Sequence, residues 1–261
     1  MTVLFEEMTR EQIKSIAPGA IAVMPTAATE QHGPHMAVGT DTLVCSTVAQ
    51  RAAEAVVDDV RVVVTPPLSY GSSFHHYPFG GVLTLTSSTF IAVVAEVLEG
   101  LSRTGFRKLV VLNGHGGNSD HVGVVGQDAV NRMGLPAVVG TCNYWDLCRD
   151  ALVAADLMPR NRIPGHAGQF ETSLILALRP DWVDEGARAE VTDASQSDGG
   201  LDVALSGAVV QSYGTWQAGP GHTDHPGEAT AEIGQAMLDV IVAEVARFYR
   251  EFARVPGAVG S

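Results

Sequence analysis

The sequence is poor in cysteine and has no long apolar run, and each shortage excludes a class of protein. Its 261 residues include three cysteines, an odd number without a CxxC pair, which is typical of a reducing compartment and not of a disulfide framework. No apolar run approaches the roughly 20 residues needed to span a bilayer, and the N-terminal stretch lacks a signal-peptide pattern. We therefore expect a cytoplasmic protein that is not embedded in a membrane.

Positive charge is also scarce. The chain has 16 basic residues against 29 acidic ones, and its net charge is −13. Such a field repels phosphate, so we expect no nucleic-acid partner and no polybasic site for a membrane surface. Apolar residues, by contrast, make up 46% of the chain and charged residues only 17%, a composition that excludes disorder and supports a buried core.

Short apolar runs alternate with longer stretches of helical spacing. The apolar runs predict strands at residues 21–24, 60–64, 109–112 and 137–139. The helical spacing predicts helices at residues 42–56, 88–101, 121–133, 171–178 and 229–252. This alternation predicts an α/β fold with a mainly parallel sheet and helices on both faces, formed by one domain over residues 1–261. Residues 191–227 are rich in Ser, Gly and Asp and are predicted to form loops over the site.

The first polar cluster reads TEQHGPH at residues 29–35 and GTD at residues 39–41, just after the first predicted strand. Parallel sheets bind ligands beyond the carboxyl ends of their strands. In extended backbone, the side chains of residues two apart point the same way, so Glu30 and His32 can reach the same ligand. The turn at the Gly-Pro pair can bring the chain back so that Asp41 reaches it too. Such carboxylates and an imidazole suit a divalent ion such as zinc. The alternatives are a solvated loop and an N-cap role for Asp41.

The second cluster, Asn113-Gly114-His115-Gly116-Gly117-Asn118, follows another predicted strand. Its glycines let the backbone approach a ligand closely, which favours a functional His115 over a hydrogen-bonded core histidine. A phosphate-binding loop is the rival interpretation, but the spacing matches neither GxGxxG nor the Walker pattern with its lysine.

The third cluster reads GHAGQFETS at residues 165–173 and contains His166 and Glu171, at the predicted start of a helix. Glu171 there can merely complement the helix dipole, and His166 can be an ordinary surface residue. Their placement after a Pro-Gly pair, in a stretch short of other charge, favours function. His222 and His225 lie in a glycine-rich region and are interpreted as structural or rim residues, not as ligands.

Serine and cysteine catalysis have little support. No GxSxG elbow exists, and the nearest run, Tyr70-Gly71-Ser72-Ser73-Phe74, lacks the second glycine. Cys45 falls within a predicted apolar helix and is interpreted as a core residue. His75 and His76, before a Tyr-Pro pair, are predicted to lie on a rim loop.

Taken together, the three clusters resemble the creatininase (creatinine amidohydrolase) family. Their motifs occur in the family's order and at similar intervals, and the resemblance runs from about residue 21 to residue 183. It implies an α/β/α sandwich around a parallel sheet, assembly as a hexamer, and a centre of two divalent metal ions, of which zinc is expected before manganese or iron. It also implies a small-molecule substrate in which a non-peptide C–N bond is hydrolysed, often in a cyclic amide or a formamide.

The resemblance extends to single residues. Four positions match the family's metal ligands, with the aspartate bridging the two ions: Glu30, His32, Asp41 and His115. His166 matches the histidine assigned to proton transfer, and Trp145 matches a tryptophan that closes over substrate in creatininase itself.

Two positions depart from the creatininase pattern. The family's loop reads NGHYEN and its glutamate binds a metal, but that position is Gly117 here. Glu171 therefore becomes the candidate to complete the second metal's shell, and with His166 it is a candidate catalytic residue. Arg162 occupies the position of a second substrate-covering tryptophan, so creatinine is not the expected substrate. The NGHGGN form is more similar to relatives that open other rings, deformylate pyrimidine precursors or trim a peptide-derived cofactor.

The expected mechanism is attack of metal-activated water on an amide-like carbon, with proton delivery by His166. The backbone amides of Gly116 and Gly117 are candidates for binding the oxyanion. Two rival classes stay open: a non-catalytic metal- or ligand-binding relative, and a metal-free enzyme that binds a nucleotide.

Residues expected to contact the substrate come from several segments. Trp145 is a candidate through the resemblance, and Arg162, His75 and Trp216 indicate a polar or anionic substrate. Another small ring or a ketone, hydrolysed on the same metal centre, is the alternative to a cyclic amide or formamide.

Overall fold

The computed structural model describes residues 2–191 and 213–257. Its centre is a four-stranded sheet of order β2-β1-β3-β4, in which every neighbouring pair is parallel. The strands are β1 (Ile21–Thr26), β2 (Val62–Val64), β3 (Lys108–Asn113) and β4 (Val138–Asn143). The predicted α/β class with a parallel sheet is therefore confirmed. Each predicted strand is present, with bounds that differ by a few residues.

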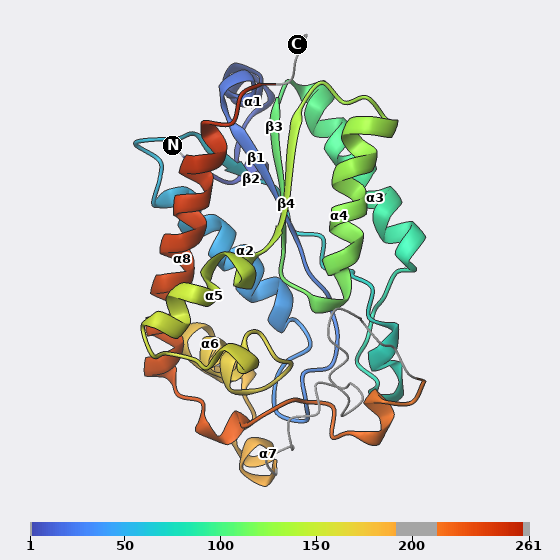
Figure 1. Cartoon of the computed structure of the whole chain (residues 1–261), viewed down its shortest axis with the longest axis vertical. Helices are drawn as coiled ribbons and strands as arrows, with labels where there is room; N and C mark the ends of the chain where they lie inside the picture. Colours follow the sequence, from blue (N-terminus) through green and yellow to red (C-terminus); the bar gives the residue numbers. More distant parts are fainter. Residues whose placement is uncertain (1, 192–212, 258–261) are drawn as a thin grey trace.

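Helices cover both faces of the sheet (Figure 1). One face packs on α1 (Arg10–Ile16), α3 (Ser87–Thr104) and α4 (Ser119–Gln127). The other packs on α2 (Thr40–Glu54), α5 (Tyr144–Ala154), α6 (Gln169–Leu178) and α8 (Ala231–Ala253). The short helix α7 (Glu185–Glu190) follows α6 and has no buried residue. The result is the three-layer sandwich expected from the sequence.

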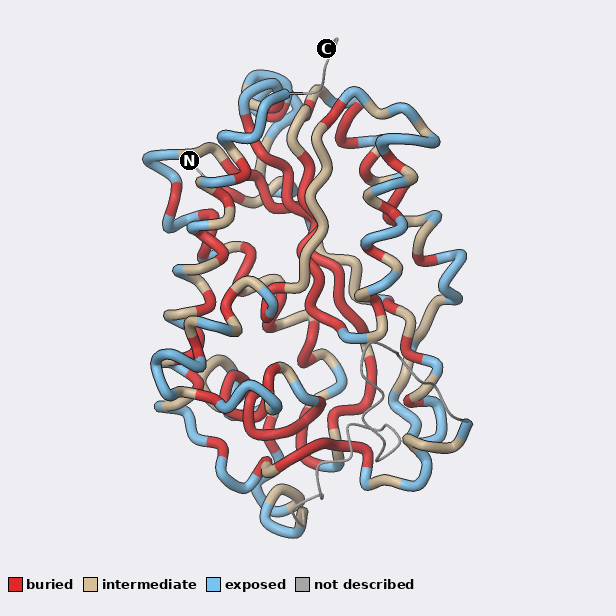
Figure 2. Tube along the Cα trace, viewed as in Figure 1, coloured by how far each residue is buried: buried red, intermediate tan, exposed pale blue. Residues whose placement is uncertain are grey.

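The alternation of side chains along β1 explains the two cores. Ile21 and Val23 belong to the core under α2 and α8, whereas Ala22 and Met24 belong to the core under α3. Because both faces are covered, all six residues of β1 are buried, and the central strands run as a buried column through the molecule (Figure 2). Only β4, at one edge, is partly exposed along its whole length.

Three predicted elements differ in detail. The helix predicted at 121–133 is α4 followed by a π-helical turn at Asp128–Arg132, where the backbone pattern widens. The N-cap of α2 is Gly39, and Asp41 lies inside the first turn, so the N-cap alternative for Asp41 is wrong. Most of the loop region predicted at 191–227 lies outside the described residues.

Helix α8, the longest described, carries both apolar and charged faces. Among the described residues, no helix is both long enough and apolar enough to cross a bilayer.

Candidate metal centre and active-site cavity

Side chains from four separate segments converge beyond the carboxyl ends of β1 and β3. Glu30 and His32 follow β1, and the left-handed backbone of Gly33 (φ +63°) allows the turn that brings the chain back to α2. Asp41 lies in the first turn of α2. The two remaining members come from the loop after β3 and from the first turn of α6: His115 and Glu171. All five side chains are buried, with exposures of 7% or less.

Asp41 lies between the two imidazoles. Its Oδ1 is 3.0 Å from His32 Nε2, and its Oδ2 is 3.1 Å from His115 Nδ1. The same nitrogen of His115 is 3.2 Å from Glu30 Oε1, and His32 Nε2 is 3.6 Å from Glu171 Oε2. Three carboxylates and two imidazoles thus face a common buried region, as the sequence predicted.

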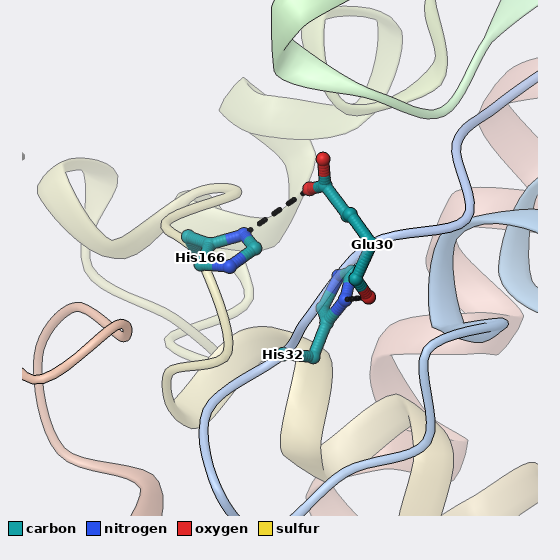
Figure 3. Close-up of side chains that lie close together, drawn as sticks. All are labelled: Glu30, His32 and His166. Carbon is teal, nitrogen blue, oxygen red and sulfur yellow. Dashed lines mark hydrogen bonds and ion pairs between the residues drawn. The ribbon is translucent and has the colours of Figure 1, made fainter. Parts of the chain in front are cut away.

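In each imidazole, the ring nitrogen that faces away from the carboxylates contacts a polar group of the protein. Nδ1 of His32 donates to the backbone carbonyl of Glu30 at 3.1 Å (Figure 3). Nε2 of His115 lies 3.1 Å from the carbonyl of Ser72 and 3.0 Å from Oγ of Ser73. These contacts leave His32 Nε2 and His115 Nδ1 directed at the carboxylates, which is how metal-binding histidines are oriented in proteins.

Burial and charge oppose each other in this cluster. Burial disfavours the charged form of His32, but Asp41 and Glu171 outweigh it and raise the pKa of His32 to about 10. Burial also disfavours the charged form of His115. The carboxylates of Glu30 and Asp41 outweigh this effect and raise the pKa of His115 well above its usual value. For Glu30, the attraction of His115 overcomes burial and holds the pKa of that carboxyl well below its ordinary range. For Glu171, burial prevails over His32 and raises the pKa to about 8.

The donor set fits a divalent cation. Asp41 Oδ2 is buried and accepts no hydrogen bond, although an imidazole nitrogen lies close to it. Such an unsatisfied buried oxygen is costly unless another group compensates it. Ligand atoms within 4.8 Å of one another form groups such as His32 with Asp41 and Glu171, or Glu30 with His75 and His115. Carboxylate oxygens and imidazole nitrogens together are ligands typical of zinc, manganese and iron.

A cavity of about 910 Å³ opens onto this cluster. Its walls include seven of the residues that the sequence predicted to act on or contact a substrate: His75, Gly116, Gly117, Trp145, His166, Glu171 and Trp216. Arg162 is not among the lining residues. Its guanidinium donates to Gln169 Oε1 at 2.5 Å and to Glu228 at 2.6 Å, so it ties the start of α6 to the segment that precedes α8. The arginines that do line the cavity are Arg149 and Arg160.

His76 was predicted on a rim loop, but the structure buries it in the short helix Phe74–Phe79 with an exposure of 1%. Its ring stacks on that of His166, with centroids 4.2 Å apart, and Trp216 packs edge-on against both. Ser73 is also buried and donates to the carboxylate of Glu30. Neither residue was predicted as part of the site. A His-His pair before Tyr-Pro has no periodicity that distinguishes a buried cavity wall from an exposed rim loop.

The segment around His222 is buried and is not a rim. His166 N donates to Thr223 Oγ1 at 2.7 Å, and Thr223 N donates back to the carbonyl of His166 at 2.7 Å. Asp224 accepts from the backbone N–H of Gln169 at 2.8 Å. This segment therefore braces the loop that carries His166. In the described residues, neither His222 nor His225 belongs to a group of potential metal ligands.

The backbone at Gly117 leaves no room for a side chain. A Cβ there would lie 2.2 Å from the carbonyl of Ser72 and 2.5 Å from Nε2 of His115. A glutamate at this position would therefore require the loop to move. Glu171, by contrast, already places a carboxylate oxygen 3.6 Å from His32 Nε2.

Comparison with known proteins identifies relatives over almost the whole chain. A family model described as creatinine amidohydrolase matches residues 6–249. The creatinine amidohydrolase of Pseudomonas putida is 31% identical over 96% of this chain and 97% of its own. A mycofactocin precursor peptide peptidase of Mycolicibacterium smegmatis is 32% identical over 66% of this chain and 63% of its own.

Solved structures agree with these sequence matches. A manganese form of creatininase has a TM-score of 0.80 and 30% identity, covering 96% of this chain and 98% of the other. A zinc–zinc form of a creatininase variant has a TM-score of 0.78 and 28% identity, covering 96% and 98%. The chain belongs to the creatininase (creatinine amidohydrolase) family and is a metal-dependent hydrolase.

Proposed function

We propose that this hydrolase cleaves a non-peptide C–N bond of a small cyclic amide or formamide-type substrate at a centre of two divalent metal ions. The observation that carries the proposal is the buried convergence of Glu30, His32, Asp41, His115 and Glu171, with one oxygen of Asp41 directed at each imidazole. Zinc is the metal we expect first, with manganese or iron as alternatives. The zinc and manganese forms of the related creatininase support this choice.

The contacts suggest how the ligands divide. Glu30 and His115, with Oδ2 of Asp41, form one set, and His32 and Glu171, with Oδ1 of Asp41, form the other. Asp41 would contribute one oxygen to each set in this arrangement. A divalent ion held by such residues would supply activation of water, with its pKa lowered to about 7, and polarisation of a carbonyl oxygen.

The protein's own groups supply proton transfer and positioning. We assign proton delivery to the leaving nitrogen to His166, whose Nδ1 lies 3.6 Å from Glu30 Oε1 at the wall of the cavity. Trp145, His75, Gly116 and Gly117 line the space for the substrate, and the backbone amides of the two glycines are our candidates for binding the oxyanion. Arg162 is withdrawn from the substrate-binding set, because its guanidinium is occupied by Gln169 and Glu228.

Gly117 and Arg162 stand where the resemblance to creatininase itself would place a glutamate and a tryptophan, so we do not expect creatinine as the substrate. A second candidate is hydrolysis of another small ring or a ketone on the same centre. It is favoured by a relative named 3-dehydro-scyllo-inosose hydrolase from Thermotoga maritima, 29% identical over 69% of this chain and 58% of its own. We further propose that residues 1–261 form one hydrolase domain, that the chain assembles as a hexamer, and that it acts in the cytoplasm.

The test begins with metal analysis of the purified protein, followed by removal of metal with a chelator and addition of zinc, manganese or iron. Each form is then assayed against a panel of cyclic amides, formamides, lactones and cyclic ketones. We expect hydrolysis that disappears on stripping and returns with one of the metals. Full turnover by protein verified to be metal-free would overturn the proposal. Bound metal without turnover of any compound would instead favour a binding protein.

A further inference from the structure

Gln31 stands between two proposed metal ligands in the sequence, yet its side chain contacts a different pair of histidines. Its Nε2 lies 2.8 Å from His76 Nδ1, 3.1 Å from His166 Nε2 and 2.9 Å from the carbonyl of Gly221. Gln31 is buried, with an exposure of 7%, and so are both histidines. Which atom donates the proton in each of these contacts therefore determines which nitrogen of each imidazole ring is protonated.

The orientation of the Gln31 amide is fixed from both ends. Its Oε1 accepts a hydrogen bond from the backbone N–H of Gly33 at 2.8 Å, which only an oxygen can do. On the other end, the carbonyl of Gly221 can only accept, so the group facing it must be the NH₂. Exchanging the oxygen and nitrogen would spoil both contacts. The nitrogen that faces the two histidines is therefore a donor.

An amide NH₂ donates and cannot accept, so an imidazole nitrogen that bonds to it must be unprotonated. The Gln31 nitrogen has two N–H groups and faces three acceptors: the carbonyl of Gly221, Nδ1 of His76 and Nε2 of His166, so one N–H is shared between two of them. Because the nitrogen has nothing to offer a further proton, neither imidazole nitrogen can be protonated on the side that faces it. In a neutral imidazole the proton then lies on the opposite nitrogen. For His76 that nitrogen is Nε2, 3.5 Å from Glu30 Oε1, and for His166 it is Nδ1, 3.6 Å from the same oxygen. Figure 3 shows the contact between His166 and Glu30.

Ring packing keeps the two imidazoles from turning away from this arrangement. The rings of His76 and His166 stack at 21° with centroids 4.2 Å apart, and Trp216 covers both at steep angles. The ring of His32 also packs against that of His166, tilted by 42° with centroids 4.6 Å apart. A 180° flip of either ring would place carbon atoms opposite the amide and forfeit its hydrogen bond.

We propose that Gln31 is a positioning residue that holds His166 in the tautomer protonated on Nδ1, the side of Glu30 and the cavity, and His76 in the opposite tautomer. The importance of this for catalysis rests on the proposed function, since it leaves the mobile proton of His166 on the nitrogen beside the reacting groups. The hydrogen-bonding claim itself stands on the contacts of Gln31. Gln31 acts through His166 and is not assigned any contact with the substrate.

The tautomers are measurable by nitrogen NMR on the full-length protein labelled with ¹⁵N-histidine and loaded with zinc. Protonated and unprotonated imidazole nitrogens resonate in well-separated regions, and the His166 signals are assigned by their loss in His166→Ala. We expect an unprotonated Nε2 and a protonated Nδ1 for His166 in the wild type. In Gln31→Glu the donor is replaced by an acceptor of the same shape, and we expect the proton to appear on Nε2.

Gln169→Glu is the matched control, because it makes the same change from amide to carboxylate at another buried glutamine, at the start of α6. The side chain of Gln169 has no hydrogen bond to His76 or His166 among the described residues, and a carboxylate there would still accept from Arg162. Its His166 signals should match the wild type. If Gln31→Glu does not fold, Gln31→Met removes the donors without adding charge, and His166 should then populate both tautomers. A wild-type proton on Nε2, or variants of Gln31 that leave the His166 pattern unchanged, would overturn the proposal.

The outcome is separable from that of the proposed function. Failure to hydrolyse any compound in the panel would count against the hydrolase assignment, but it would leave the nitrogen signals of His166 as they are. Conversely, an active enzyme whose His166 is protonated on Nε2 would keep the proposed function and remove the role of Gln31.

Discussion

The backbone carbonyl of Glu30 accepts a hydrogen bond from Nδ1 of His32 at 3.1 Å, so one residue offers a carboxylate to the site and also orients the imidazole two positions further along. Substituting the Glu30 side chain removes a ligand and leaves this backbone contact in place. The orientation of His32 toward Asp41 and Glu171 should therefore survive changes at the Glu30 carboxylate, which makes the two proposed metal sites separable by mutation.

Replacing one ligand carboxylate by its amide should lower the metal content by an amount that depends on whether the carboxylate belongs to one proposed ligand set or to both. In protein dialysed against zinc, Glu30→Gln and Glu171→Gln should each retain about one ion where the wild type holds about two, because each removes a ligand from one set only. Asp41→Asn should retain almost none, because both sets use Asp41. Metal analysis per subunit measures this directly. Equal losses in all three variants would contradict the division of ligands.

Zinc binding should release protons and strengthen as pH rises. The pKa of His32 is raised to about 10 and that of His115 is raised as well, so both imidazoles are protonated at pH 7 in metal-free protein and must lose a proton to bind metal. The apparent affinity should fall up to about tenfold per pH unit for each displaced proton as the pH is lowered. Calorimetry in buffers of different ionisation enthalpy should show release of about three protons, two from the imidazoles and one from Glu171, whose pKa is raised to about 8. A binding heat that is independent of the buffer would argue against this.

His166→Ala should separate catalysis from metal binding. Loss of a proton-transfer group typically lowers turnover by about 10²–10⁴-fold. The metal content should stay near that of the wild type, because the proposed ligand sets do not include His166. The rate is measured with whichever compound of the panel the wild type hydrolyses. A variant with normal metal and undiminished turnover would exclude His166 as the proton donor.

Gly116 and Gly117 offer a matched pair for the loop after β3. A Cβ at Gly117 would collide with the carbonyl of Ser72 and the ring of His115, whereas a Cβ at Gly116 meets nothing within 4 Å. Gly117→Ala should therefore lower the free energy of unfolding by about 1–3 kcal/mol and reduce zinc binding through displacement of His115. Gly116→Ala should stay within about 0.5 kcal/mol of the wild type. Urea unfolding compares the two, and equal effects would mean that the loop relaxes freely.

Tyr249, on the buried side of α8, should tolerate loss of its hydroxyl group. Its Oη is buried and has no hydrogen-bond partner among the described residues. Tyr249→Phe removes this unsatisfied group, so the free energy of unfolding should be unchanged or raised by up to about 1 kcal/mol. Tyr249→Ala, which leaves a cavity, should cost about 3–5 kcal/mol. A marked loss of stability in the phenylalanine variant would reveal a partner for the hydroxyl.

The parts of the site that follow strand ends were predictable from sequence. Glu30 and His115 come directly after the apolar runs of β1 and β3, and parallel neighbours end at the same edge of a sheet. The turn at Gly33 and the return to Asp41 followed from glycine and proline chemistry. The same local rules placed the central strands and the long helices within a few residues of their observed bounds.

What the sequence could not predict depends on contacts between distant segments. Arg162 was expected in the substrate pocket, but its partner Glu228 lies on a segment far along the chain. His76 was expected at a rim, and its burial depends on stacking with His166 and on Trp216. Helix α5 was not predicted, and the π-helical turn after α4 was expected as part of an α-helix, because neither has a local signal strong enough to fix it. Pairings of this kind are set by tertiary packing, which periodicity does not encode.

The order in which the proposed ligands occur along the chain has a consequence for biosynthesis. Glu30, Asp41 and His115 lie in or next to β1, α2 and β3, whereas Glu171 belongs to α6, which is synthesised later. Because growing chains tend to fold from the N-terminal side, one half of the centre can be assembled while the other half still lacks a ligand. In the proposed centre of two ions, the second ion would then be acquired only after α6 has docked.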